Sequence, residues 1–97
     1  MQENIPVGIW GQRRRRYLRE HRNPIYAALF LITKLDAHLA EIDHQAEEMF
    51  SQLVMQMMEQ EGVTEQLKTD NQMGWVGRMN NIRDRAMEMI NAELIFI

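Results

Sequence analysis

The chain has 97 residues, no cysteine and a formal net charge of −3. A domain of this length buries only roughly 60–65% of its unfolded surface, and no disulfide can reinforce the core, which excludes a disulfide-stapled secreted scaffold. No apolar run approaches the roughly 20 residues of a membrane-spanning helix, and the arginines follow the first apolar stretch, unlike those of a signal peptide. We therefore expect one cytoplasmic, soluble domain with no membrane contact.

Residues 1–11 are predicted to form an extended arm, because Pro6, Gly8 and Gly11 disfavour a helix there. Residues 12–22 contain no helix breaker and are predicted to form a short, arginine-rich first helix. The Asn23-Pro24 pair ends it, because the residue before a proline is pushed out of the α region. Asn23 can cap the next helix, and Pro24 suits a first helical position.

Residues 24–61 are predicted to form one long second helix. Its apolar side chains recur at alternating spacings of three and four, at Ile25, Ala28, Ile32, Leu35, Leu39, Ile42, Ala46, Met49 and Leu53. This heptad pattern is typical of a helix that packs along its length against another helix. Gly62 favours a left-handed helix end, and Thr64 can cap the helix that follows.

Residues 65–92 are predicted to form a third helix, with a possible break near Gly74 or Gly77, and residues 93–97 an apolar tail that docks on a neighbouring surface. The short connection at 62–64 makes the second and third helices antiparallel neighbours. The sequence therefore predicts a single all-α domain built on a long helical hairpin. Two helices alone cannot bury apolar stripes of this length on both of them, so a homodimeric bundle is also possible.

The most conspicuous candidate site is the basic N-terminal segment. Residues 1–22 carry six arginines against two glutamates, whereas residues 23–97 carry five basic and twelve acidic side chains, so the chain has a basic head on an acidic body. The candidate side chains of this segment are Trp10, Arg13, Arg14, Arg15, Arg16, Tyr17 and Arg19. They form a possible DNA or RNA contact through residues 13–22. Alternatively, the basic helix simply lies on the acidic second helix.

Two further surfaces are candidates for binding a protein or nucleoprotein partner. The acidic face of the second helix contributes Glu41, Asp43, Glu47 and Glu48, and the segment around residue 75 contributes Trp75, Arg78, Asn81 and Arg85. The latter side chains could meet a phosphate or carboxylate, or could instead pair with glutamates of the second helix. Methionines near the hairpin tip fill gaps in a core or form adaptable binding surfaces.

The sequence offers few of the residue patterns that enzyme catalysis requires. Ser51 is the sole serine and has no histidine three or four residues away, and no glycine-rich phosphate loop is present. Glu41 and His44 have the Glu-x-x-His spacing of helical di-metal sites, but the third helix offers no histidine to complete one. We expect a protein that is not an enzyme and binds no cofactor or metal.

Several of these segments resemble the TnpV family, small proteins encoded on transposons and conjugative elements of Firmicutes. The matching stretches are residues 8–13, 17–22, 39–43, 46–50, 65–68, 71–73 and 75–83, including the run Trp-Val-Gly-Arg-Met-Asn-Asn-Ile at 75–82. The resemblance implies a mobile-element gene and carries over no catalytic residue.

Together, residues and resemblance predict a non-enzymatic interaction protein of a mobile element that binds a host or element protein or nucleoprotein. A sharper version is an inhibitor of host defence, such as an anti-CRISPR protein, in which the acidic helix competes for a basic nucleic-acid channel. The alternative is a DNA-binding accessory factor of transposition that uses the arginine helix.

Overall fold

A computed structural model describes residues 7–97, so residues 1–6 of the expected arm lie outside it. The described residues form α1 (Ile9–His21), α2 (Asn23–Leu31), α3 (Leu35–Glu61), α4 (Glu65–Asp70), α5 (Gln72–Ile90) and the π-helical turn η1 (Asn91–Ile95). The all-α class is confirmed, and no strand occurs in this part of the chain. None of its helices is both long and apolar enough to cross a membrane.

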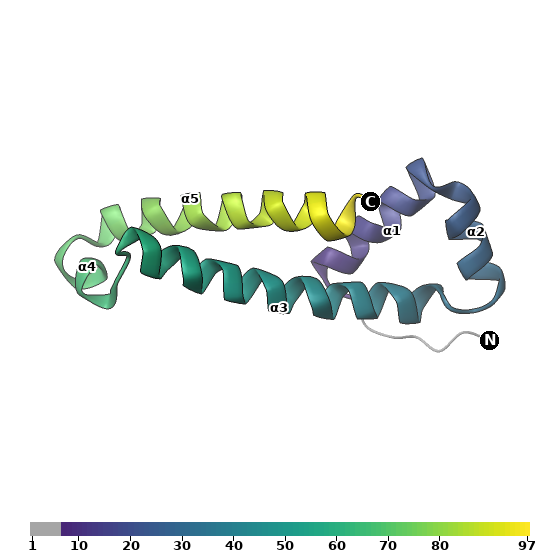
Figure 1. Cartoon of the computed structure of the whole chain (residues 1–97), viewed down its shortest axis with the longest axis horizontal. Coiled ribbons are helices and arrows are strands. Elements are labelled where there is room, and N and C mark those ends of the chain that lie inside the picture. The colour runs from purple at the N-terminus through teal and green to yellow at the C-terminus, as the bar shows by residue number, and fades with distance from the viewer. Residues whose placement is uncertain (1–6) are drawn as a thin grey trace.

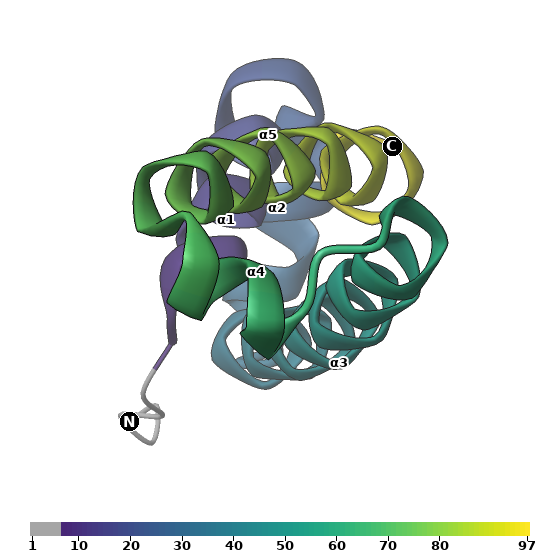
Figure 2. The ribbon, with the colours of Figure 1, turned by 90° about the vertical axis from the view of Figure 1, so that its left-hand side faces the viewer.

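The molecule is an elongated stem with a helical head, measuring 54 × 24 × 18 Å. Figure 1 shows α3 and α5 running side by side along the stem, α4 at its tip, and α1 and α2 at the opposite end. Viewed from the α4 end, α5 lies above α3, with α1 and α2 behind them (Figure 2). The stem is held near its tip by a cluster of buried side chains comprising Val63, Met79 and Ile82.

The turn at the stem's tip forms as the sequence predicts. Gly62 has a φ of 68°, and the Val63 N–H donates to the carbonyl of Met58 at 2.9 Å, which closes the last turn of α3. The Thr64 side chain accepts from the Leu67 N–H at 3.2 Å and caps α4. Because Gly62 ends α3 and Thr64 begins α4 two residues later, the chain reverses its direction at this turn.

The prediction of one continuous helix over 24–61 is wrong, because the chain turns between α2 and α3. Thr33 has a φ of 57°, and the Lys34 N–H donates to the carbonyl of Leu29 at 2.9 Å. This is the same helix-ending hydrogen bond as at Gly62, made here by a β-branched residue in a conformation that such residues rarely adopt. The Asn23 cap is also not observed, since the Asn23 amide donates instead to the carbonyl of Arg19.

The prediction of one helix over 65–92 is wrong as well. The break lies at Asn71, before both glycines, because the Asn71 side chain accepts from the Gly74 N–H at 3.0 Å and caps α5. A Cβ on Gly74 would lie only 2.6 Å from the Asn71 side chain, so the glycine makes room for this cap. Gly77 lies inside α5 without interrupting it.

The arginine helix begins at Ile9, three residues earlier than the sequence predicts, so residues 9–11 belong to a helix and not to an extended arm. The Gly11 N–H donates to the Asp43 carboxylate at 3.0 Å, which fixes the N-terminal turn of α1 on α3. The absence of a side chain on Gly11 allows this approach, since a Cβ there would lie 2.9 Å from the backbone oxygen of Leu39. A carboxylate next to a helix N-terminus is a stabilising arrangement.

The C-terminal segment packs against α1 and α3. Ile95 is fully buried in a cluster with Trp10, Ala46 and Ile90, so α1, α3, α5 and η1 meet there. In contrast, no residue of α2 is buried, and Leu31 is 78% exposed. The predicted heptad seam is therefore buried within the chain at Leu35, Leu39 and Ala46 of α3, whereas no position of α2 is buried.

Candidate functional site

The four consecutive arginines of α1 have different environments. Arg14 shares the buried face of α1 with Gly11 and Leu18, at helical spacings of three and four. Its Nη1 donates to the backbone oxygens of Ile95 at 3.0 Å and Ile97 at 2.8 Å. Arg14 therefore ties α1 to the C-terminal segment and is not available to a partner in this conformation.

Arg14 also contacts a histidine on α3. Its Nε donates to His38 Nε2 at 3.5 Å, and an imidazole nitrogen that accepts in this way is unprotonated. Burial, followed by the nearby charge of Arg14, lowers the pKa of His38. Burial likewise lowers the pKa of Arg14 from its very high ordinary value. We therefore assign a neutral His38 beside a charged Arg14 at pH 7.

This arrangement predicts a loss of stability in acid. Below the ordinary histidine pKa of about 6.5, the unfolded chain binds a proton at His38 that the folded protein does not, so the free energy of unfolding falls as the pH falls, by at most about 1.4 kcal/mol per pH unit. Urea unfolding at pH 7.5 and 5.5 should show a smaller difference for His38→Gln than for the wild type. His44→Gln, at an exposed position of the same helix, is the control and should retain the wild-type difference. An unchanged difference in His38→Gln would contradict the assignment.

The acidic side chains of α3 that contact α1 bind groups other than the arginines. Besides the Gly11–Asp43 bond, the Trp10 indole N–H donates to Glu47 Oε2 at 3.1 Å. Trp10 is only 3% exposed, so it is a core side chain. Of the predicted acidic face, Asp43 and Glu47 thus bind α1 itself, and Glu47 remains exposed, as Glu41 and Glu48 do.

The other arginines of this segment lack acidic partners in the part of the chain that the structure describes. No ion pair forms there at Arg13, Arg15, Arg16, Arg19 or Arg22. The Arg13 guanidinium lies 5.2 Å from the centre of the Trp10 ring, and its Nη1 is buried without a hydrogen-bond partner. Within residues 7–97, five positive charges therefore have no acidic contact, four on one side of α1 and one just after its end.

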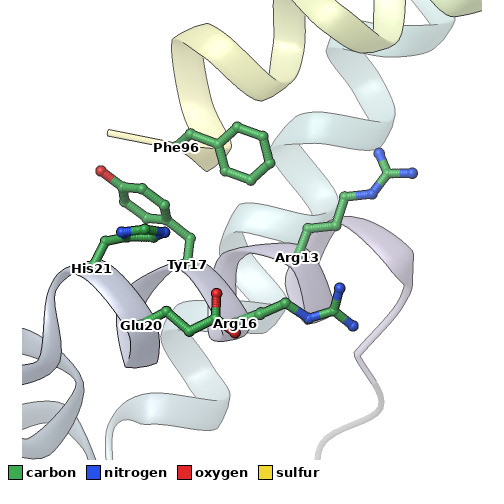
Figure 3. A pocket seen from close by; sticks show the side chains of 6 residues that line it. All are labelled: Arg13, Arg16, Tyr17, Glu20, His21 and Phe96. Carbon is green, nitrogen blue, oxygen red and sulfur yellow. The ribbon is translucent and has the colours of Figure 1, made fainter.

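A pocket of about 490 Å³ opens beside these arginines (Figure 3). Its lining side chains are Arg13, Arg16, Tyr17, Glu20, His21 and Phe96. The Tyr17 ring centre lies 5.2 Å from that of His21 and 5.6 Å from that of Phe96. In Figure 3, Phe96 and Tyr17 lie next to each other on one side of the pocket, while the guanidinium groups of Arg13 and Arg16 lie on the other side of the view. The site is therefore both cationic and aromatic.

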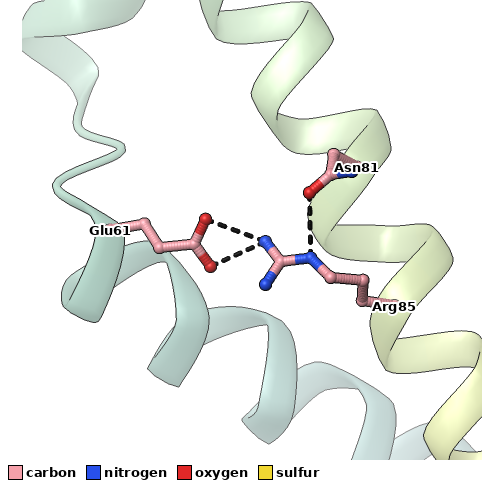
Figure 4. A network of polar contacts seen from close by, with 3 residues as sticks. All are labelled: Glu61, Asn81 and Arg85. Atoms are coloured by element: carbon pink, nitrogen blue, oxygen red, sulfur yellow. Dashed lines mark hydrogen bonds and ion pairs between the residues drawn. The ribbon is translucent and has the colours of Figure 1, made fainter.

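The candidate residues around position 75 lie far along the stem and do not join this pocket. Arg85 Nη2 donates to both Glu61 carboxylate oxygens at 2.7 and 2.8 Å, and its Nε donates to Asn81 Oδ1 at 2.8 Å (Figure 4). The Lys68 ammonium lies 4.7 Å from the centre of the Trp75 ring. Asn81 and Arg85 thus bind within the chain, as the alternative interpretation of their spacing proposes, while Arg78 is exposed.

The two remaining glutamates of the predicted acidic face make contacts within their own helix. Glu41 accepts from Gln45, and Glu48 lies 3.7 Å from His44. Within residues 7–97, no three histidine, aspartate or glutamate side chains form a group that could hold a metal ion. Met55 and Met73 are exposed, so thioether surface is available near the tip of the stem.

Sequence reasoning missed three side chains of the pocket, namely Glu20, His21 and Phe96. The first two follow Tyr17 within one helical turn, a signal that was present in the sequence. Phe96 had only the apolar character of the tail as a signal, since its contact with α1 spans most of the chain.

Fold and site together define an all-α protein with a cationic, aromatic head on a two-helix stem. The chain matches the family described as Transposon-encoded protein TnpV over residues 1–95 and belongs to that family. It is thus a transposon-associated protein. No curated protein and no solved structure matches this chain significantly.

Proposed function

We propose that this TnpV-family protein is a non-enzymatic interaction protein of a mobile element, and that it binds a nucleoprotein partner by contacting nucleic acid with the arginines of α1. The observation that carries the proposal is that Arg13, Arg15, Arg16, Arg19 and Arg22 form no ion pair in the described chain. Guanidinium groups of this kind are well suited to phosphate oxygens.

Charge distribution supports this choice over the alternative in which the basic helix merely neutralises α3. The hydrogen bonds that α1 makes with acidic side chains of α3 use the Gly11 amide and the Trp10 indole. The arginines are therefore not needed to neutralise Asp43 and Glu47, and their electrostatic field is directed to solvent.

The inhibitor of host defence would use the opposite charge, that of the α3 face. Its support is weaker, because Asp43 and Glu47 already accept hydrogen bonds from α1, so only Glu41 and Glu48 of the four predicted acidic residues have no bond to that helix. An inhibitor that competes for a basic channel requires a denser acidic surface. Inhibition of host defence stays part of the proposal for the case in which the nucleoprotein partner is a defence effector.

Reversing the charge of two exposed arginines tests the proposal. Arg16→Glu combined with Arg19→Glu should weaken binding to a fluorescein-labelled 20-base-pair DNA, or to the same strand unpaired, at least ten-fold at low salt. The slope of log affinity against log salt should fall by about two, because two phosphate contacts are lost. Fluorescence anisotropy across a salt series measures both quantities.

The matched control is Lys34→Glu combined with Arg83→Glu, which changes the net charge equally at exposed positions outside α1. Equal weakening by both pairs would show a general charge effect and not a site on α1. If the wild type binds neither DNA at low salt, the proposal is wrong.

A further inference from the structure

We infer that the pocket between α1 and Phe96 receives one unstacked nucleobase together with its adjoining phosphate, so that the preferred ligand is a single strand of nucleic acid. This inference rests on the proposed function and specifies the ligand of the same site. It is carried by the aromatic walls of the pocket, by its two guanidinium groups and by the way Arg14 fixes its far wall.

The aromatic walls are suited to a base. Tyr17 and Phe96 come from opposite ends of the chain, with ring centres 5.6 Å apart and planes inclined at 43°. Phe96 remains 47% exposed although its neighbour Ile95 is fully buried, so part of its ring is presented to solvent. Proteins that bind single strands stack successive bases on such side chains, and they do so with little sequence preference.

The charged lining places a phosphate near the base. Arg13 and Arg16 stand one helical turn apart on α1, and the pocket that they line with Glu20 carries a positive net charge. The buried Arg13 Nη1 without a hydrogen-bond partner is a donor that an entering phosphate oxygen would satisfy after a small movement of the side chain. The Glu20 carboxylate can accept from the N–H groups on a base edge.

The far wall of the pocket is preorganised. Arg14 donates to the backbone oxygens of Ile95 and Ile97, which flank Phe96, and the Phe96 N–H donates to the carbonyl of Asn91 at 2.8 Å. The Phe96 backbone is therefore held on both sides before any ligand arrives. A wall that is already ordered reduces the entropy lost on binding.

The dimensions favour a single strand over a duplex. The pocket volume of about 490 Å³ lies within the roughly 300–1,000 Å³ range of small-ligand sites. A base stacked inside a duplex cannot present a face to the surface that the contacting rings of Tyr17 and Phe96 form, whereas an unpaired base can be splayed out and stacked on protein.

The test compares a labelled dT12 strand, a 12-base-pair duplex and free dTMP, all measured with the intact 97-residue protein. The wild type should bind dT12 at least five-fold more tightly than the duplex. Phe96→Leu keeps an apolar side chain but removes the stacking surface, and should weaken dT12 binding about 5–20-fold while changing duplex binding less than two-fold. Phe30→Leu, at an exposed aromatic position on α2, is the control and should bind dT12 as the wild type does.

Photocrosslinking gives a second readout that does not depend on a variant. A strand with 5-iodouracil in place of thymine, irradiated with the wild type, should attach to the peptides that contain Tyr17 or Phe96. Circular dichroism confirms that Phe96→Leu is folded, and Arg16→Gln supplies a second pocket variant that should weaken dT12 binding.

The outcomes separate this inference from the proposed function. Equal binding of strand and duplex, unaffected by Phe96→Leu, overturns the inference and leaves the arginine contact standing. If dTMP binds as tightly as dT12, the ligand of the pocket is a free nucleotide, and the inference of a single strand is overturned. Crosslinks confined to other peptides also overturn it. If neither nucleic acid binds, the proposed function fails first.

Discussion

Replacing Arg14 with methionine should lower the free energy of unfolding by about 2–4 kcal/mol, the largest effect that we expect from any single arginine in the chain. Methionine retains much of the apolar stem but removes the donors to the backbone oxygens of Ile95 and Ile97 and to His38. Hydrogen bonds from a charged group are worth roughly 1.5–3 kcal/mol each, and the better burial of methionine offsets part of their loss.

The measurement is urea unfolding followed by the helical circular-dichroism signal. Arg16→Met is the matched control, because Arg16 is an exposed neighbour on the same helix without a hydrogen bond or ion pair in the described residues. Its effect should stay within about 0.5 kcal/mol. If Arg14→Met proves as mild as Arg16→Met, the tie between α1 and the C-terminal segment contributes little to stability.

Residue type predicted some helix ends correctly, although it failed for the Asn23 cap. Gly62 at a φ of 68° and Thr64 as a cap are such cases, and both are confirmed. Thr33 adopts a similar left-handed φ without being a glycine, so nothing at 32–34 distinguished a turn from continuing helix. The heptad pattern runs through this turn uninterrupted. Apolar spacing indicates which face of a helix is apolar, but it does not indicate whether the helix is continuous.

The start of α1 was missed for a tertiary reason. Gly8 and Gly11 disfavour helix locally, yet the Asp43 carboxylate receives the Gly11 amide and the helix begins at Ile9. Local propensity is a weak prior that such a contact overrides. The glycine that looked like a breaker is the residue that allows α1 to approach α3.

The candidate site was predicted as a segment but not resolved into individual roles. Composition alone identified the arginine run, and Leu18 together with Gly11 could have indicated that Arg14 faces inward, since the three share one helical face. The pocket's aromatic wall was beyond prediction, because Phe96 meets Tyr17 only after α3 and α5 bring the chain back to α1. The predicted homodimer stays a prediction, with the exposed α2 as the surface that a second copy could cover.

Two glycine-to-alanine substitutions should change stability in opposite directions. At Gly11, the added Cβ would lie 2.1 Å from Val7 Cγ1 and 2.9 Å from the backbone oxygen of Leu39, so α1 must move away from α3. Val7 can rotate, but the Leu39 backbone cannot yield without distorting α3. We expect the free energy of unfolding to fall by about 1–3 kcal/mol, the usual magnitude for overpacking.

At Gly77, nothing lies within 4 Å of the added Cβ, and the residue is in the interior of α5. Alanine removes the entropy that glycine loses on folding without meeting any neighbour, so Gly77→Ala should raise the free energy of unfolding by about 0.5–1 kcal/mol. The two variants add the same single methyl group to a helix, which makes each the control for the other in one urea titration. Equal shifts of the same sign would mean that helix propensity alone decides both positions, and that α1 does not approach α3 as closely as Gly11 requires.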